Sequence, residues 1–197
     1  GKTERECVAE GVRQAEAKGF KNLMDVVKNG ETLKAGDRVY RAWMNKDIML
    51  FIIGEKPMEC GMNILGAHID SPRIDIKQNP LYEDEHLAYL DTHYYGGIKK
   101  YQWVALPLAL HGVVVKKDGT TVTLNIGDKP GDPVFYISDL LIHLAADQMG
   151  KTAAKVIEGD SLNIIIGSEP KKDTDKDPVK SAILDILKEQ YLSLIHI

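Results

Sequence analysis

Short apolar runs separated by turn residues make up most of this sequence, between two amphipathic segments near its ends. The first segment, residues 3–18, predicts a helix because Thr3 and Glu6 have the spacing of a capping box and Gly19 follows. The second predicts a helix that begins at Pro178. Strands are predicted for residues 39–43 and 48–53, with Asn45-Lys46-Asp47 as the turn between them, and for residues 63–68, 121–127 and 162–166. This pattern predicts an α/β fold.

The character of the sequence changes after about residue 75. Residues 81–98 are rich in aromatic residues and histidine and are punctuated by glycine. One further helix is predicted for residues 138–149, with Ser138 or Asp139 as its N-cap. We therefore expect residues 1–75 to begin one domain, a mixed sheet with flanking helices. Residues 76–191 are expected to form a β-rich domain inserted into it.

The composition argues against several classes of protein. Net charge is −4 and the charged residues are well mixed, without the basic stripe that tracks a nucleic-acid backbone. No apolar run reaches the ~18 residues that a membrane span needs. Cys7 and Cys60 have no close partner in the sequence, which argues against a disulfide framework and favours a reducing, cytoplasmic setting.

The sequences at both ends of the chain are unusual for a natural protein. The chain starts with Gly1 rather than methionine, directly at a predicted helix. Residues 192–197 read Leu-Ser-Leu-Ile-His-Ile, which resembles the translation of a transposon-end adaptor used in sequencing libraries. We expect these residues to be a non-native tail and the natural protein to continue beyond Tyr191. A natural apolar tail is the alternative.

The sharpest local feature is a His-x-Asp motif, His68 and Asp70, at the end of a predicted strand. Residues i and i+2 of a strand point to the same side, and that side can face a cleft where the strand ends. A neutral imidazole there can bind zinc, and a nearby carboxylate can orient it. The motif alone is weak, and a structural histidine is the more frequent explanation. No second metal ligand follows from spacing.

Two other segments leave alternatives open. Residues 92–103 contain Gly96-Gly97 among aromatic residues, which suits either a loop over a ligand or a turn packed by its own tyrosines. The glycines do not complete a phosphate-binding loop, so nucleotide binding is disfavoured. On the predicted helix, His143 lies one turn after Asp139, and a hydrogen bond between them on the helix surface is favoured over a functional role.

Three segments in this order form a more specific combination: residues 66–72, Tyr95-Gly96-Gly97 with Trp103, and Ile142-His143-Leu144. They resemble the aspartyl aminopeptidase family, which also includes vacuolar aminopeptidase I. The bacterial branch is the most similar, because residues 66–103 read like its signature almost throughout. The resemblance extends over residues 2–191 and implies an N-terminal fragment of such a protein.

The resemblance implies a metal-dependent aminopeptidase that removes single residues from peptide N-termini through a co-catalytic pair of zinc ions in each subunit. It assigns residues 1–75 to a zinc-peptidase domain and residues 76–191 to an inserted dimerisation domain. His68 matches the first zinc ligand and Asp70 the aspartate that orients it. His143 matches a histidine that reaches into a neighbouring subunit's active site. The family assembles as a homo-oligomer, a dodecamer built from dimers.

The sequence departs from the family pattern in two ways. The bridging aspartate, the general-base glutamate and the remaining ligands of the family lie downstream of this segment. These 197 residues are therefore expected to bind zinc poorly and not to turn over substrate. Members that act on acidic residues carry Asp-Arg-Asp where this chain has Ala105-Leu106-Pro107, so neutral or apolar N-terminal residues are favoured as substrates.

Two other functions remain as hypotheses. A non-catalytic assembly or peptide-binding protein could retain the dimerisation domain without the catalytic residues. An unrelated β-rich binding module with a chance His-x-Asp is disfavoured, because three motifs occur in the family order.

Overall fold

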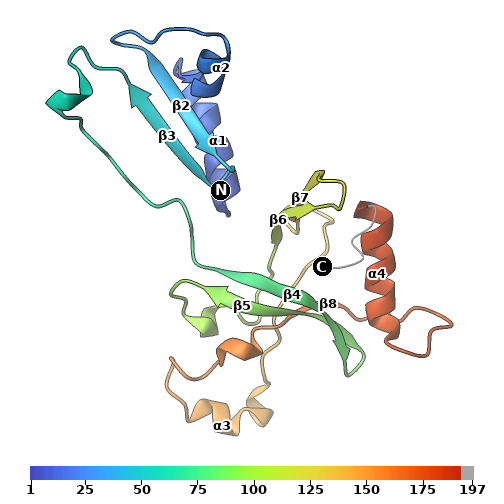
Figure 1. The fold of residues 1–197 in the computed structure, drawn as a ribbon. Coiled ribbons are helices and arrows are strands. Elements are labelled where there is room, and N and C mark those ends of the chain that lie inside the picture. The colour runs from blue at the N-terminus through green and yellow to red at the C-terminus, as the bar shows by residue number, and fades with distance from the viewer. Residues whose placement is uncertain (192–197) are drawn as a thin grey trace. The chain divides into compact units, whose positions relative to one another are not determined.

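The computed structural model of the protein describes residues 1–191 (Figure 1). The chain divides into two compact units, Gly1–Ser71 and a second that begins at Pro72. The predicted boundary after residue 75 falls inside the first strand of the second unit, β4 (Arg73–Asp84). Both units combine strands and helices, which confirms the α/β class. The predicted non-native tail, residues 192–197, lies outside the described residues.

The first unit is a small mixed sheet with helices. Its elements are α1 (Glu4–Ala17), β1 (Lys21–Asn22), α2 (Leu23–Lys28), β2 (Arg38–Trp43), β3 (Asp47–Ile52) and a 3-10 turn, η1 (Met58–Cys60). The strand order is β1-β2-β3, with β1 parallel and β3 antiparallel to β2. Helix α1 packs against β2 and β3 (Figure 1).

The predicted start of α1 and the predicted β2–β3 hairpin are both confirmed. The Thr3 side chain accepts a hydrogen bond from the Glu6 backbone N–H at 3.3 Å, as an N-cap does. In the hairpin turn, Met44 and Asn45 have φ of 51° and 55°. Positive φ at both central positions matches the right-handed twist of the flanking strands, so this turn sets their register.

Tyr40 of β2 joins the sheet to α1. Its side chain is buried, and its hydroxyl donates a hydrogen bond of 2.7 Å to Glu16 Oε1. The hydrogen bond to this carboxylate, together with burial, raises the pKa of Tyr40 to about 12. The folded-state pKa lies above the unfolded value of about 10. The stability from this contact is therefore complete below about pH 10 and is lost as the pH rises toward 12.

We expect a spectrophotometric titration to show Tyr40 ionising near pH 12. Glu16→Gln should lower the Tyr40 pKa, because it removes the negative charge that opposes tyrosinate formation. Tyr40→Phe should reduce the loss of stability between about pH 10 and 12, because the group that ionises in this range is then absent. An unchanged alkaline profile in Tyr40→Phe would contradict this assignment.

Residues 63–68 form no strand in the structure, so that prediction is wrong. Ile64 is exposed and Leu65 is 99% exposed. A buried strand of a parallel or mixed sheet needs a neighbouring strand and covered faces. The β1-β2-β3 sheet does not include this segment, and within residues 1–191 no other strand pairs with it. Its apolar side chains therefore remain uncovered.

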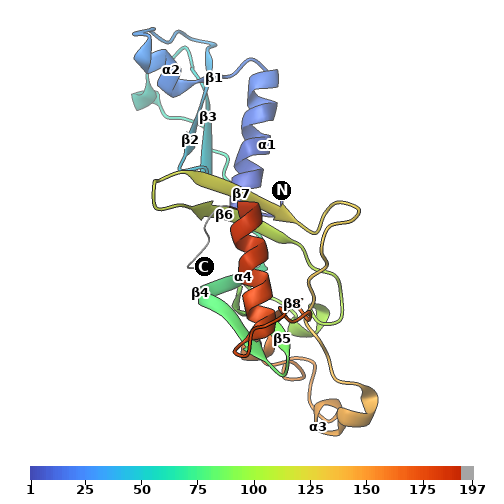
Figure 2. The ribbon, with the colours of Figure 1, turned by 90° about the vertical axis from the view of Figure 1, so that its right-hand side faces the viewer.

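The second unit contains a three-stranded antiparallel sheet, a separate hairpin and a long C-terminal helix (Figure 2). Its strands and helices are β4, β5 (Leu87–Tyr95), β6 (Leu110–Val115), β7 (Thr121–Ile126), α3 (Ala146–Met149), β8 (Ile164–Gly167) and α4 (Pro178–Tyr191). Its 3-10 turns are η2 (Lys100–Gln102), η3 (Ile142–Leu144) and η4 (Gly159–Ser161). The sheet order is β4-β5-β8, β6 pairs with β7, and α4 packs on the sheet.

The core of this unit lies around β5 and β8. Its buried members are Leu90, Ile137, Ile157, Leu162 and Ile164. Thr92 is fully buried, and its hydroxyl donates to the Leu162 carbonyl at 2.5 Å. The Asn163 side chain accepts from the Thr92 N–H at 3.1 Å and so satisfies this buried backbone donor. The segment before β8 is thereby held to β5.

The predicted helix over residues 138–149 is wrong. The structure has irregular backbone followed by η3 and the four-residue α3. Asp139 Oδ1 accepts from the Leu140 N–H at 2.8 Å and from Gln148 Nε2 at 2.9 Å, not from an N–H one helical turn ahead as an N-cap does. Local bonding by aspartate competes with helix formation. Asp139 therefore pairs with Gln148 instead of His143.

Gly127, directly after β7, occupies a position that only glycine fits. Its φ is +106°, and an added Cβ would lie 3.0 Å from Ala109 Cα and 3.1 Å from the Leu108 carbonyl oxygen. We expect Gly127→Ala to lower the free energy of unfolding by roughly 2–4 kcal/mol, from backbone strain and overpacking together. Urea unfolding measures this value.

Gly131 provides the matched control. Its φ is +90°, and an added Cβ would meet nothing within 4 Å. Gly131→Ala should therefore cost only the backbone strain, about 1–2 kcal/mol. Equal losses in the two variants would show that the contact with Leu108 and Ala109 is irrelevant.

Candidate metal centre

His68 and Asp70 lie in the irregular segment that ends the first unit, and the structure brings them together. His68 Nδ1 is 3.2 Å from Asp70 Oδ1 and 3.0 Å from the Asp70 backbone oxygen. The His68 side chain is 83% exposed and the Asp70 side chain 36%. The imidazole is thus held on one edge by a carboxylate while its other edge faces outward.

This contact determines which ring nitrogen can bind a metal. Both Asp70 oxygens are acceptors, so they favour the tautomer in which His68 Nδ1 carries the proton. The lone pair then lies on Nε2, the nitrogen away from Asp70. A histidine that donates one N–H to a carboxylate and ligates through its other nitrogen is the usual arrangement at protein zinc sites. The His68–Asp70 pair therefore fits one zinc ligand and its orienting partner.

The pair does not make a complete site by itself. Zinc in proteins takes three or four protein ligands. Within residues 1–191, no three His, Cys, Asp or Glu side chains gather as metal ligands. His111 is engaged elsewhere, with its Nε2 3.1 Å from Asp128 Oδ2 in the second unit. A zinc site at His68 would therefore need further ligands.

His143 lies in η3 of the second unit, where its side chain is exposed. Four apolar neighbours are also exposed: Leu140, Leu141, Ile142 and Leu144. Large apolar side chains gathered on one exposed loop are a typical feature of a surface that contacts another protein. The structure does not pair His143 with Asp139, and it places His143 in a different unit from His68.

The aromatic segment after β5 is packed by its own neighbours. The Arg73 guanidinium lies 4.2 Å from the Tyr95 ring centroid, and Lys100 Nζ lies 5.6 Å from that of Tyr94. Gly96 has φ of +76° and sits against Pro72. These contacts favour the interpretation of a packed turn over that of a loop covering a ligand.

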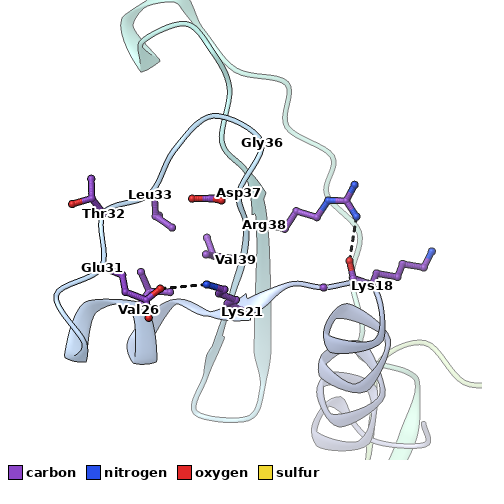
Figure 3. Close-up of a pocket in the computed structure, with 11 residues that line it drawn as sticks. Lys18, Lys21, Val26, Glu31, Thr32, Leu33, Gly36, Asp37, Arg38 and Val39 are labelled. Carbon is purple, nitrogen blue, oxygen red and sulfur yellow. Dashed lines mark hydrogen bonds and ion pairs between the residues drawn. The ribbon is translucent and has the colours of Figure 1, made fainter.

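The first unit also contains a depression of about 330 Å³, shown in Figure 3. Three of its charged side chains have partners: Lys21 Nζ lies 3.3 Å from Glu31 Oε2, and Arg38 donates to the Lys18 carbonyl at 3.1 Å. Neither His68 nor Asp70 lines it, and its lining has no histidine, cysteine or serine. This depression therefore offers no ligand set or nucleophile for hydrolysis.

Comparison with known protein families shows which family this chain belongs to. A sequence model of the family described as aminopeptidase I zinc metalloprotease (M18) matches residues 1–195. The chain belongs to the M18 family. This match confirms the resemblance seen in the three motifs and excludes an unrelated β-rich module.

Individual M18 proteins align with nearly all of this chain but extend well beyond it. A probable M18 family aminopeptidase 1 from Clostridium acetobutylicum is 59% identical over 191 residues, which cover 96% of this chain and 41% of that protein. One from Thermotoga maritima is 44% identical over 190 residues, with the same shares. The chain thus spans about two fifths of the length of these relatives.

Solved structures give the same result. The M18 aminopeptidase of Thermotoga maritima superposes with a TM-score of 0.88 at 43% identity, over 96% of this chain and 41% of that one. Aminopeptidase I of Clostridium acetobutylicum gives a TM-score of 0.84 at 59% identity, over 96% and 42%. Yeast aminopeptidase 1, at 19% identity and a TM-score of 0.64 over 95% and 42%, shares the fold. Within residues 1–191, no helix is long and apolar enough to cross a membrane.

Proposed function

We propose that this chain is part of a metal-dependent aminopeptidase that hydrolyses the N-terminal residue of peptides through a co-catalytic zinc pair. The observation that carries the proposal is the His68–Asp70 contact of 3.2 Å, which leaves Nε2 as a ligand atom. Membership of a zinc metalloprotease family and relatives named as aminopeptidases support it. Cytoplasmic location is part of the proposal, supported by the free Cys7 and Cys60.

In this proposal the residues of the chain have distinct roles. His68 holds a zinc ion through Nε2. Asp70 keeps the ring proton on Nδ1 and so fixes the ring's orientation and raises its basicity. The chemistry that a zinc pair supplies when bound is polarisation of the scissile carbonyl and activation of a water. The remaining ligands and the general base would come from residues outside this chain.

We further propose that the first unit is part of the peptidase domain and that the second is an inserted dimerisation domain. His143 would then act at the active site of a neighbouring subunit, within a dodecamer built from dimers. The support is the exposure of His143 together with its apolar neighbours Leu141 and Leu144. Ala105-Leu106-Pro107, without acidic or basic side chains, favours peptides with neutral or apolar N-terminal residues.

The proposal is tested with the protein at the length of its relatives. We expect it to release the first residue of a leucine-initiated peptide and to leave the N-acetylated peptide intact, because the free amino group is part of what is recognised. A chelator should abolish release, and added zinc should restore it. Chelator-resistant release, or cleavage of the acetylated peptide, would contradict the proposal.

The same assay tests a second candidate, a non-catalytic assembly or peptide-binding protein. One observation favours it: residues 1–191 bring no three metal-ligating side chains together. Peptide binding without any release, at a zinc content below one ion per subunit, would support this candidate over the aminopeptidase.

A further inference from the structure

A second cavity lies entirely within the second unit and has no part in the proposed peptidase chemistry. Its volume is about 550 Å³, and it lies between η2 and the segment of residues 150–159. The charged side chains that line it are Lys100, Lys151, Lys155 and Glu158. Thr152 adds a hydroxyl group. Lys151 and Lys155 were not singled out from the sequence, because they lie in a segment without a recognised motif, whereas Lys100 belongs to the aromatic segment 92–103.

The charge balance of this cavity is positive although the chain as a whole is negative. Lys151 Nζ lies 3.4 Å from Glu158 Oε1, so one ammonium group is offset by the one carboxylate of the lining. Lys155 has no acidic partner among residues 1–191. Lys100 lies over the Tyr94 ring, a contact that leaves its full charge in place. The ammonium groups of Lys100 and Lys155 are therefore not offset by a carboxylate of the lining.

The walls of the cavity are held by packing. Lys100 is half-buried, and its Nζ lies 5.6 Å from the Tyr94 ring centroid. Gly159 lies directly against that ring, since an added Cβ would come within 2.7 Å of Tyr94 Cε1. The N–H of Lys155 donates to the Thr152 carbonyl at 2.8 Å, and Ile157 is buried in the core. Lysine ammonium groups on a fixed backbone lose less freedom when a ligand binds.

We propose that this cavity binds a phosphate group, either free or carried on a small molecule. Lysine binds phosphate as a point charge, and a threonine hydroxyl donates a hydrogen bond to its oxygens. The volume exceeds what one phosphate fills and lies in the range of small-molecule sites. The occupied site would join η2 to the segment that follows α3.

The test is calorimetric titration of the protein with sodium phosphate, adenosine monophosphate and adenosine, at constant ionic strength set with sodium chloride. We expect saturable binding of the two phosphates and none of adenosine. Binding of adenosine monophosphate at least about tenfold tighter than phosphate would identify the ligand as a carried phosphate. The reverse order would identify the free ion. Absence of saturable phosphate binding, or equal binding of adenosine, would overturn the proposal.

Two variants make the result specific to this cavity. Lys155→Ala should weaken phosphate binding about tenfold, whereas Lys172→Ala, an exposed lysine outside the cavity, should not change it. Glu158→Gln removes the opposing carboxylate and should tighten binding about threefold. Misfolding cannot produce such a gain. Unchanged binding in Lys155→Ala, or unchanged or weaker binding in Glu158→Gln, would overturn the assignment. Because the readout is binding, the result is independent of peptidase activity.

Discussion

Replacing His68 with alanine in the protein at the length of its relatives is expected to lower aminopeptidase activity about 1,000-fold. A metal ion contributes several kcal/mol of transition-state stabilisation, and each 1.36 kcal/mol corresponds to a factor of ten in rate. The side chain is 83% exposed in the structure, so its removal should leave the fold intact. Zinc content per subunit, kcat/KM and the circular dichroism spectrum are measured together.

Two further variants distinguish the loss of a metal ligand from a general loss of folded protein. Asp70→Asn keeps the size of the side chain but removes the carboxylate that faces His68 Nδ1, and should reduce metal affinity or activity about 10–100-fold. His86→Asn is the matched control, because His86 is an exposed histidine with φ of +62°, a conformation that asparagine tolerates. Full activity and zinc content in His68→Ala would remove this residue from the site.

The sequence predicted those elements whose signals are local. The α1 cap, the β2–β3 hairpin and the helix that begins at Pro178 each depend on residues within a few positions of one another, and the structure has all three. The His68–Asp70 contact belongs to the same class, because a spacing of two residues limits how far apart the side chains can lie. The family resemblance rested on motif order and is confirmed by the match over residues 1–195.

The predictions that failed depended on partners distant in the sequence. Residues 63–68 have the composition of a buried strand, but a strand needs hydrogen-bonding neighbours, and the described sheets provide none for this segment. Residues 138–149 have helical periodicity, but Asp139 bonds to Leu140 and Gln148 and the apolar side chains remain exposed. In both places the apolar side chains have no packing partner within the described chain. The local preference for a strand or a helix was therefore not enough to form regular structure.

Truncation of Leu162, one of the largest fully buried side chains of the second unit, should be strongly destabilising. Its side chain is 0% exposed and belongs to the core that joins β5, β8 and Ile137. Its carbonyl also accepts the buried Thr92 hydroxyl at 2.5 Å, so the backbone there cannot move freely to fill a cavity. We expect Leu162→Ala to lower the free energy of unfolding by about 2–5 kcal/mol, because transfer and cavity costs add.

Leu141→Ala deletes the same atoms from a side chain that is 70% exposed, and so isolates the effect of burial. In urea unfolding at a concentration where the protein is monomeric, it should change the free energy of unfolding by less than about 0.5 kcal/mol. At higher concentration, Leu141→Ala should weaken assembly if the exposed segment of residues 140–144 contacts a neighbouring subunit. Leu162→Ala should lower the free energy of unfolding at every concentration. Equal effects of the two substitutions on the monomer would mean that the core does not lie around Leu162.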